Sequence, residues 1–232
     1  MIKILFITSI IFVLQFSEPI LVKQAYAHCS SKPIPGVNWE GCRKRNLILS
    51  GTDLKNSNFR ATNFTSTDMR RSEIDGANFR KAVVIRAAFD EASATGNIFE
   101  AAHGYRASFR KSNLTNAIFY KSEFMRVDFS GSVLTGADFS KSDLGRTRFD
   151  DAILGNSNFA FANVARADFR NAILTGPITL NGAYLFQTRF EGVDLSKSVG
   201  LLQWQIDMAC GDNSTRLPAG ISKPKSWPCG SD

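Results

Sequence analysis

A bulky apolar residue recurs every five positions along most of this 232-residue chain. From Trp39 to Leu174 this large column has 28 positions, and 25 of them carry Leu, Phe, Met, Ile, Val or Trp. The three exceptions are Lys44, Ala94 and Gly104. Two positions earlier in each unit, a small column from residue 37 to residue 172 has Ala, Ser, Thr or Cys at 24 of its 28 positions. This double pattern constrains the fold more than any other feature of the chain.

A period of five fits neither of the common secondary structures. An α-helix would scatter these positions around its circumference, and a single strand would place them alternately on its two faces. A coil in which each five-residue unit forms one side, followed by a corner, keeps every bulky residue inside. The large column then fills the interior, and the small column lets the next corner close.

The large column shifts by one position after Leu174, where it continues as Leu180, Leu185, Phe190 and Leu195. The extra residue falls in segment 175–178, whose Gly and Pro suit a bulge or loop. Allowing for this shift, 14 of the 16 Phe residues after residue 27 lie in the large column.

Units such as Ala77–Lys81, Ala137–Lys141 and Ala167–Asn171 resemble those of the pentapeptide-repeat proteins, and the likeness covers about residues 37–198. The resemblance implies an all-β solenoid, a right-handed quadrilateral β-helix with four units per turn. About eight turns at roughly 4.8 Å per layer would make a rod about 38 Å long.

Both ends of such a rod expose unpaired backbone and need caps. We expect an N-terminal cap at 28–38, the repeat domain at 39–198, and a C-terminal helix and tail at 199–232. Segment 39–42 resembles the opening coil of some exported members. Segment 200–211 reads as a short amphipathic capping helix stopped by Gly211. The tail after it resembles that of many bacterial relatives.

The first 27 residues read as a secretory signal. Lys3 supplies a positive start, residues 4–16 form an apolar run, and Ala25-Tyr26-Ala27 matches a small-x-small cleavage pattern. We therefore expect cleavage after Ala27 and a periplasmic or secreted protein, with an uncleaved anchor as the alternative. A lipoprotein is disfavoured, because His28 precedes Cys29 where a small residue is needed.

The four cysteines form two sequence-local pairs, Cys29 with Cys42 and Cys210 with Cys229. An even number in an exported chain predicts disulfides, which we expect to pin the two caps. The alternative is that Cys42 or Cys210 is a buried thiol. The four cysteines show no CxxC spacing, which disfavours a zinc site.

Four units per turn would stack residues that are 20 positions apart, which aligns a column of five arginines. They are Arg86, Arg106, Arg126, Arg146 and Arg166. Further basic residues stack on neighbouring corners, namely Lys81, Lys121, Lys141, Arg71 and Lys111. Like charges about 4.8 Å apart repel by about 0.9 kcal/mol even in water, so an anionic partner would favour such a column. The alternative is a solvated basic face, shielded by Glu123, Asp143 and Asp168.

One region departs from the repeat. Ala94 and Gly104 occupy the large column, and Val84 is small for it. A thinned core beside His103, Tyr105 and Arg106 is a candidate recognition patch, and the alternative is a defect filled by neighbouring side chains.

The chain carries two His and no GxSxG, HExxH or phosphate-binding loop, so we predict no enzyme, cofactor, metal or small-molecule substrate. The net charge of +7 favours a non-enzymatic scaffold that presents a basic face to an anionic envelope polymer, lipopolysaccharide phosphates or an acidic protein. Direct nucleic-acid binding is disfavoured, because no aromatic residues interleave the basic column and the expected compartment is wrong.

The resemblance also implies an alternative, because some pentapeptide-repeat proteins mimic DNA and bind DNA gyrase. Those rods are acidic and cytoplasmic, whereas this chain is basic and carries an export signal. A third candidate is a structural or assembly module that forms a homodimer through its C-terminal cap.

Overall fold

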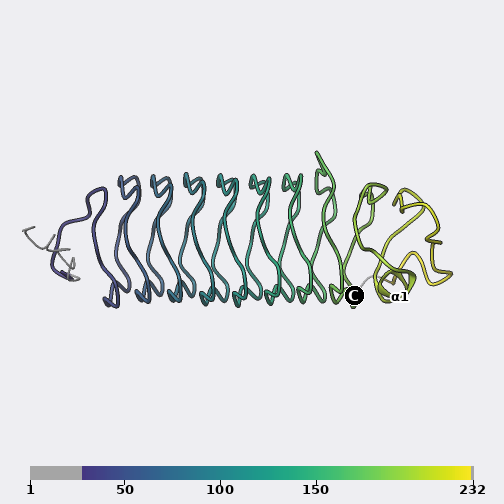
Figure 1. Ribbon diagram of the computed structural model, residues 1–232, viewed down its shortest axis with the longest axis horizontal. Coiled ribbons are helices and arrows are strands. Elements are labelled where there is room, and N and C mark those ends of the chain that lie inside the picture. The colour runs from purple at the N-terminus through teal and green to yellow at the C-terminus, as the bar shows by residue number, and fades with distance from the viewer. Residues whose placement is uncertain (1–27, 231–232) are drawn as a thin grey trace, which may run out of the picture.

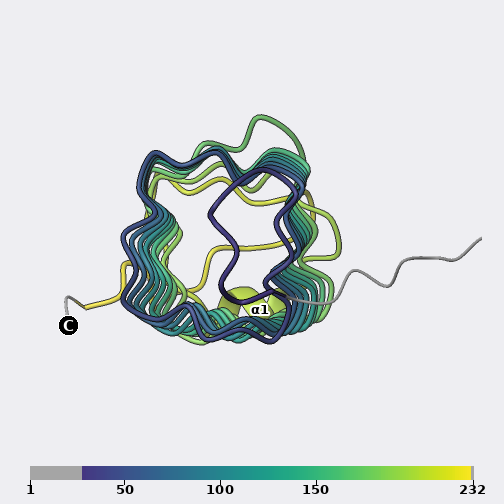
Figure 2. The ribbon, with the colours of Figure 1, turned by 90° about the vertical axis from the view of Figure 1, so that its left-hand side faces the viewer.

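Figure 1 shows the computed structural model, which describes residues 28–230 as a rod of stacked coils. Seen along the rod, each coil is a roughly square ring, and successive rings lie over one another (Figure 2). The expected signal segment, residues 1–27, lies outside the described residues. In the described part of the chain, no helix combines the length and the apolar character needed to cross a bilayer.

Parallel β-bridges between residues 20 positions apart join each turn to the next. The four series begin with Asn38↔Asn58, Arg43↔Asn63, Ile48↔Asp68 and Asp53↔Glu73. Each bridge is isolated, so within residues 28–230 the coil is built from single bridges and not from longer strands. The reason is the short unit, since two corner residues follow every three residues of extended chain. The solenoid expected from the period of five is thus confirmed.

The corners require an uncommon backbone conformation. The second corner residue has a positive φ, as in Asn56 at 56° and Gly76 at 67°. Most L-residues avoid this left-handed region, and Gly and Asn tolerate it best. The conformation persists because the same residue donates its backbone N–H to the next turn, for example from Asn56 to the carbonyl of Asp75 at 2.9 Å.

The large column forms the core. Every apolar member from Trp39 to Phe169 is buried, and Phe rings of successive turns stack. The ring centroids of Phe89 and Phe109 lie 4.6 Å apart with the planes 2° from parallel. In the small column, the Ser112 hydroxyl donates to the Phe109 carbonyl at 2.6 Å. Ser is therefore as suitable as Ala there, because its hydroxyl finds a partner inside its own corner.

The frame shift lies where the sequence indicates. Ile153 pairs with Ile173, 20 positions on, whereas Asn158 pairs with Thr179, 21 positions on. The extra residue is thus accommodated within segment 175–178, and the core stacking continues through Phe169 and Phe190, whose centroids are 5.2 Å apart.

The N-terminal cap explains why Lys44 interrupts the large column. Its Nζ lies 3.7 Å from the Trp39 ring centroid and donates to the Cys29 carbonyl at 2.7 Å. Cys29 is bonded to Cys42, as expected. Burial lowers the pKa of Lys44. This cation therefore holds the cap segment against the first turn.

The C-terminal cap contains one helix, α1, at Gln203–Met208 (Figure 1). The expected helix over 200–211 is too long, because Ala209 is already extended and Cys210 forms a bridge with Arg189. Gly211 is not the helix stop either. A Cβ there would lie 2.4 Å from the Trp227 ring, so Gly211 makes room for Trp227.

Polar contacts fasten this cap to the last full turn. The buried Gln205 side chain donates through Nε2 to the carbonyls of Leu180 at 2.9 Å and Ala183 at 2.8 Å. The expected disulfide joins Cys210 and Cys229. Backbone groups at the end of the coil therefore find partners within the chain.

Candidate functional site

The five stacked arginines lie on one corner of the coil and form what we call the arginine ladder, comprising Arg86, Arg106, Arg126, Arg146 and Arg166. Each is the second residue of its corner, with φ between 54° and 59°. The backbone N–H of Arg126 donates to the Gly145 carbonyl at 2.9 Å, and that of Arg146 to the Ala165 carbonyl at 2.9 Å. These bonds hold successive ladder positions in line.

All five ladder arginines are exposed, and within residues 28–230 none of them forms a salt bridge. Arginines elsewhere on the rod do, as in the pairs Arg60–Glu40 at 2.7 Å and Arg110–Asp90 at 2.8 Å. The ladder is therefore a row of positive charges without direct neutralisation.

The carboxylates expected to shield the ladder have other partners. Glu123 contacts His103 Nδ1 at 3.0 Å, and Asp168 pairs with Arg170 at 2.6 Å. Asp143 accepts hydrogen bonds from the Gly145 N–H at 3.1 Å and from Asn163 Nδ2 at 3.1 Å. Within residues 28–230, none of these three carboxylates forms a salt bridge with a ladder arginine.

Neighbouring aromatic and amide groups contact two of the ladder arginines, Arg106 and Arg166. The Arg106 guanidinium lies 5.2 Å from the Tyr105 ring centroid. Arg166 donates through Nε to Gln187 at 2.8 Å and lies 6.0 Å from the Phe186 ring. These contacts orient the side chains but leave their charges available.

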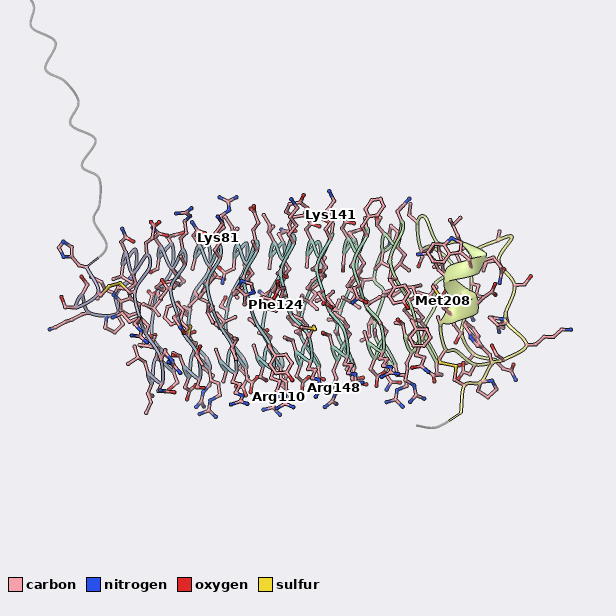
Figure 3. The ribbon with its side chains drawn as sticks, turned by 90° about the horizontal axis from the view of Figure 1, so that it is seen from below. Lys81, Arg110, Phe124, Lys141, Arg148 and Met208 are labelled. Atoms are coloured by element: carbon pink, nitrogen blue, oxygen red, sulfur yellow. A yellow bond between two sulfur atoms is a disulfide. The ribbon has the colours of Figure 1, made fainter. Side chains whose placement is uncertain are left out.

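The other basic residues lie in different surroundings. Lys81 and Lys141 project from one long edge of the rod, and Arg110 and Arg148 from the opposite edge (Figure 3). Lys121 and Lys141 flank the Tyr120 hydroxyl, and hydrogen bonding to these lysines lowers the pKa of Tyr120.

A hollow of about 410 Å³ on another corner contains charges of both signs. Arg71 and Lys111 line it together with Arg70, Asp90, Glu91 and Arg110. Burial would raise the pKa of Asp90, but hydrogen bonds from Arg110 and Ser108 lower it overall. Salt bridges of Arg70 with Asp68 and of Arg110 with Asp90 neutralise part of the positive charge at this corner, in contrast to the ladder.

The expected thinned core at Gly104 is filled. A Cβ at this position would lie 2.7 Å from the Phe124 ring, so Phe124 occupies the space that a side chain at 104 would take. His103 is exposed and contacts Glu123, whereas Tyr105 lies beside Arg106. Of this proposed patch, Arg106 belongs to the ladder and Tyr105 lies beside it, whereas His103 pairs with Glu123.

The sequence interpretation missed a groove beside the ladder. Its walls are Met125 and Phe186, its floor is Gly145 and Ala165, and Arg126, Asp143, Arg146, Asn163 and Arg166 border it. The missed signal is the loss of a bulky first corner residue in two successive turns. Within the described residues, no cluster of three or more His, Cys, Asp or Glu side chains is arranged to hold a metal ion.

Comparison with known proteins places these turns among repeat proteins. A model described as a pentapeptide repeat region matches residues 102–176, and one described as pentapeptide repeats in eight copies matches residues 48–84. No curated protein matches the chain.

Solved structures that resemble the chain include those of two proteins with different described roles. One is trypsin-treated QnrB1, described as a plasmid-mediated fluoroquinolone resistance protein, with 19% identity, coverage of 80% of this chain and 84% of that chain, and a TM-score of 0.44. The other is HetL, described as involved in heterocyst differentiation regulation, from the cyanobacterium Nostoc sp. strain PCC 7120. Its identity is 20%, with coverage of 80% and 91% and a TM-score of 0.31.

Proposed function

Because this chain is a pentapeptide-repeat protein, we propose that it is a non-enzymatic interaction scaffold that presents the arginine ladder to an anionic partner. The partner class is an anionic envelope polymer, lipopolysaccharide phosphates or an acidic protein. The proposal includes the finer architecture, which is a right-handed quadrilateral coil of about eight turns with α1 as its cap.

One observation carries this proposal, namely the row of five exposed arginines without a salt bridge among the described residues. Each occupies a left-handed corner position that Gly or Asn would adopt with less strain. Stacked like charges also repel each other by about 0.9 kcal/mol per neighbouring pair at about 4.8 Å. An anion bound along the ladder would offset both costs.

The compartment is part of the proposal. Two disulfides suit an oxidising environment, which agrees with cleavage after Ala27 and a periplasmic or secreted protein. Intact mass of the protein recovered from the periplasm of its native host tests this. The expected mass lacks residues 1–27 and four hydrogens, and an uncleaved or reduced chain would contradict it.

The binding test compares two variants with the same loss of charge. Replacing Arg106, Arg126 and Arg146 by Gln removes the middle of the ladder. The matched control replaces Arg70, Arg80 and Arg110 by Gln, because these arginines already pair with carboxylates.

Retention on heparin and on immobilised lipopolysaccharide should fall strongly for the ladder variant and little for the control. Retention of the native protein should also weaken as salt rises, because screening shortens to about 8 Å at 0.15 M. Equal retention of both variants would show that general basicity, and not the ladder, binds the probes.

A role in assembly is the second candidate, favoured by exposed apolar residues on the C-terminal cap. Leu202 is 54% exposed and Trp204 is 48% exposed. Sedimentation of the mature protein with Trp204→Ser tests this role, since a dimer held by this cap should become a monomer. Mimicry of DNA receives no support from the ladder, because a DNA mimic needs negative charge.

A further inference from the structure

The first residues of the ladder corner form their own stack, which is interrupted beside three of the arginines. Along successive turns this stack reads Ile85, Tyr105, Met125, Gly145, Ala165 and Phe186. The two small residues leave a groove of about 350 Å³. Met125 is 37% exposed and Phe186 is 38% exposed, so apolar surface forms both walls.

The groove is not forced by packing. A Cβ at Gly145 would meet its nearest atom, Asp143 Oδ1, at 3.4 Å and the Ala165 carbonyl oxygen at 3.8 Å. Gly145 does not have a positive φ, so the backbone admits a larger residue. A bulky side chain would therefore fit, as it does one turn earlier at Met125.

The dimensions suit one bulky side chain. Met125 and Phe186 are three turns apart, or about 14 Å at 4.8 Å per layer, with two vacant layers between them. The volume lies near the lower end of the roughly 300–1,000 Å³ found for ligand sites. On the ladder side, the groove is bordered by the positive charges of Arg126, Arg146 and Arg166.

We propose that this groove binds the bulky apolar side chain of an extended acidic peptide segment of a partner protein, whose carboxylates pair with Arg126, Arg146 and Arg166. The inference rests on the proposed function, since it needs the ladder to bind anions. It adds the partner class and the feature that the partner must carry.

The geometry favours a peptide over the other anions. In an extended peptide, side chains two positions apart lie on one side about 6.6–6.8 Å from each other, so acids on either side of an apolar residue reach separate ladder positions. A sulfated or phosphorylated sugar polymer offers no bulky apolar group for the groove. A bilayer surface is flat and would leave the floor at Gly145 and Ala165 unfilled.

Asp143 restricts how an acidic peptide can be oriented in the groove. Its carboxylate lines the groove beside its hydrogen-bond partners Gly145 and Asn163. Because like charges repel, the acidic side chains of the peptide must lie on the arginine side.

The test uses two synthetic ten-residue peptides rich in Glu, one with a central Phe and one with Ser at that position. Fluorescence anisotropy measures their binding to the mature protein. Native protein should bind the Phe peptide about tenfold more tightly, as expected for burying most of one aromatic side chain. Gly145→Leu fills the groove and should lower the affinity for the Phe peptide about tenfold, to that for the Ser peptide.

The matched control is Thr135→Leu, which adds a similar side chain at the first position of a different corner and should keep the preference. Ala165→Leu fills the other vacant layer and repeats the test if Gly145→Leu does not fold. Circular dichroism checks the fold of each variant.

The outcomes separate this inference from the proposed function. Equal affinity of native protein for the two peptides overturns the groove, although the ladder proposal stands. If the native protein binds neither heparin nor either peptide, the groove inference and the ladder proposal are both overturned. A third outcome would favour a lipid as the ligand of the groove and overturn the peptide proposal. In it, the native protein binds phosphatidylglycerol vesicles, Gly145→Leu loses this binding, and the native protein binds the two peptides equally.

Discussion

The ring of Phe124 occupies the space beside Gly104, so that a Cβ on residue 104 would lie only 2.7 Å from the ring. Gly104 is buried although it carries no side chain, and Phe124 lies one turn further along the same stack. The ring of Phe124 therefore fills the gap that Gly104 leaves in the large column.

Restoring the repeat at this position should destabilise the protein. Gly104→Leu overpacks the core against Phe124, and we expect a loss of roughly 1–3 kcal/mol in the free energy of unfolding. Urea denaturation measures it. Combining Gly104→Leu with Phe124→Ala should recover part of the loss, and a Gly104→Leu protein more stable than native would contradict the packing.

Two phenylalanines should differ sharply in their contribution to stability. Phe129 is fully buried in the stack, whereas Phe161 is 64% exposed on a corner. Phe129→Ala should cost roughly 3–5 kcal/mol because it leaves a cavity, and Phe161→Ala should cost far less. Equal losses in urea denaturation would refute the assignment of the column.

The ladder should reduce stability in the absence of a partner. Arg126 has a φ of 57°, which Asn tolerates better than Arg, and its charged neighbours repel it. Arg126→Asn should raise the melting temperature by roughly 2–4 °C, which corresponds to about 1 kcal/mol in a protein of this size. The gain should shrink at high salt, because salt screens repulsion. If the gain in melting temperature did not depend on salt, it would come entirely from relief of backbone strain at residue 126 and not from reduced charge repulsion.

The C-terminal disulfide should stabilise the cap mainly by restricting the unfolded chain. Cys210 and Cys229 are 19 positions apart, and a loop near this length corresponds to roughly 3 kcal/mol. The double substitution Cys210→Ser with Cys229→Ser should lower stability by about this amount, measured by thermal unfolding. Unchanged stability would mean that α1 and Trp227 suffice to hold the cap.

Asp212 should make the C-terminal region sensitive to acid. A hydrogen bond from Ser214, together with bonds from Thr215 and the backbone N–H of Gly192, lowers the pKa of Asp212 from 3.8 to about 2. Because the folded pKa lies below the unfolded one, the stabilisation is present above about pH 4 and is lost as pH falls towards 2.

The variant Asp212→Asn tests this linkage through melting temperatures measured between pH 6 and 2, as suggested by the pKa range of about 4 to 2. Native protein should be the more stable at the upper end, and the two proteins should converge at the lower end. A difference that grows on acidification would have the wrong sign for a lowered pKa.

The sequence predicted the coil because each unit carries its own signal. Phe89 and Phe109 both face inward and stack, so the period in the sequence is the period of the packing. The shift at 175–178 was readable for the same reason, because the bulky residues resume one position later. Disulfide pairing followed from the proximity of the cysteines along the chain.

Features that depend on neighbouring turns were harder to predict. The helix ends at Met208 because Cys210 joins the bridge with Arg189, which the amphipathic pattern does not encode. Gly145 and Ala165 look like ordinary small residues until they are aligned 20 positions apart, which places them in adjacent layers. Whether a carboxylate pairs with a ladder arginine depends on the orientations of both side chains, which the sequence alone does not specify.

Each turn contacts only the turn before it and the turn after it, through bridges at a spacing of 20 residues. An in-frame duplication of one such stretch within 107–146 would therefore add a whole ring with its own arginine and leave every older contact intact. Duplications of this kind would lengthen the arginine ladder by one ring at a time. Variants that differ by whole rings would then match anionic partners of different length.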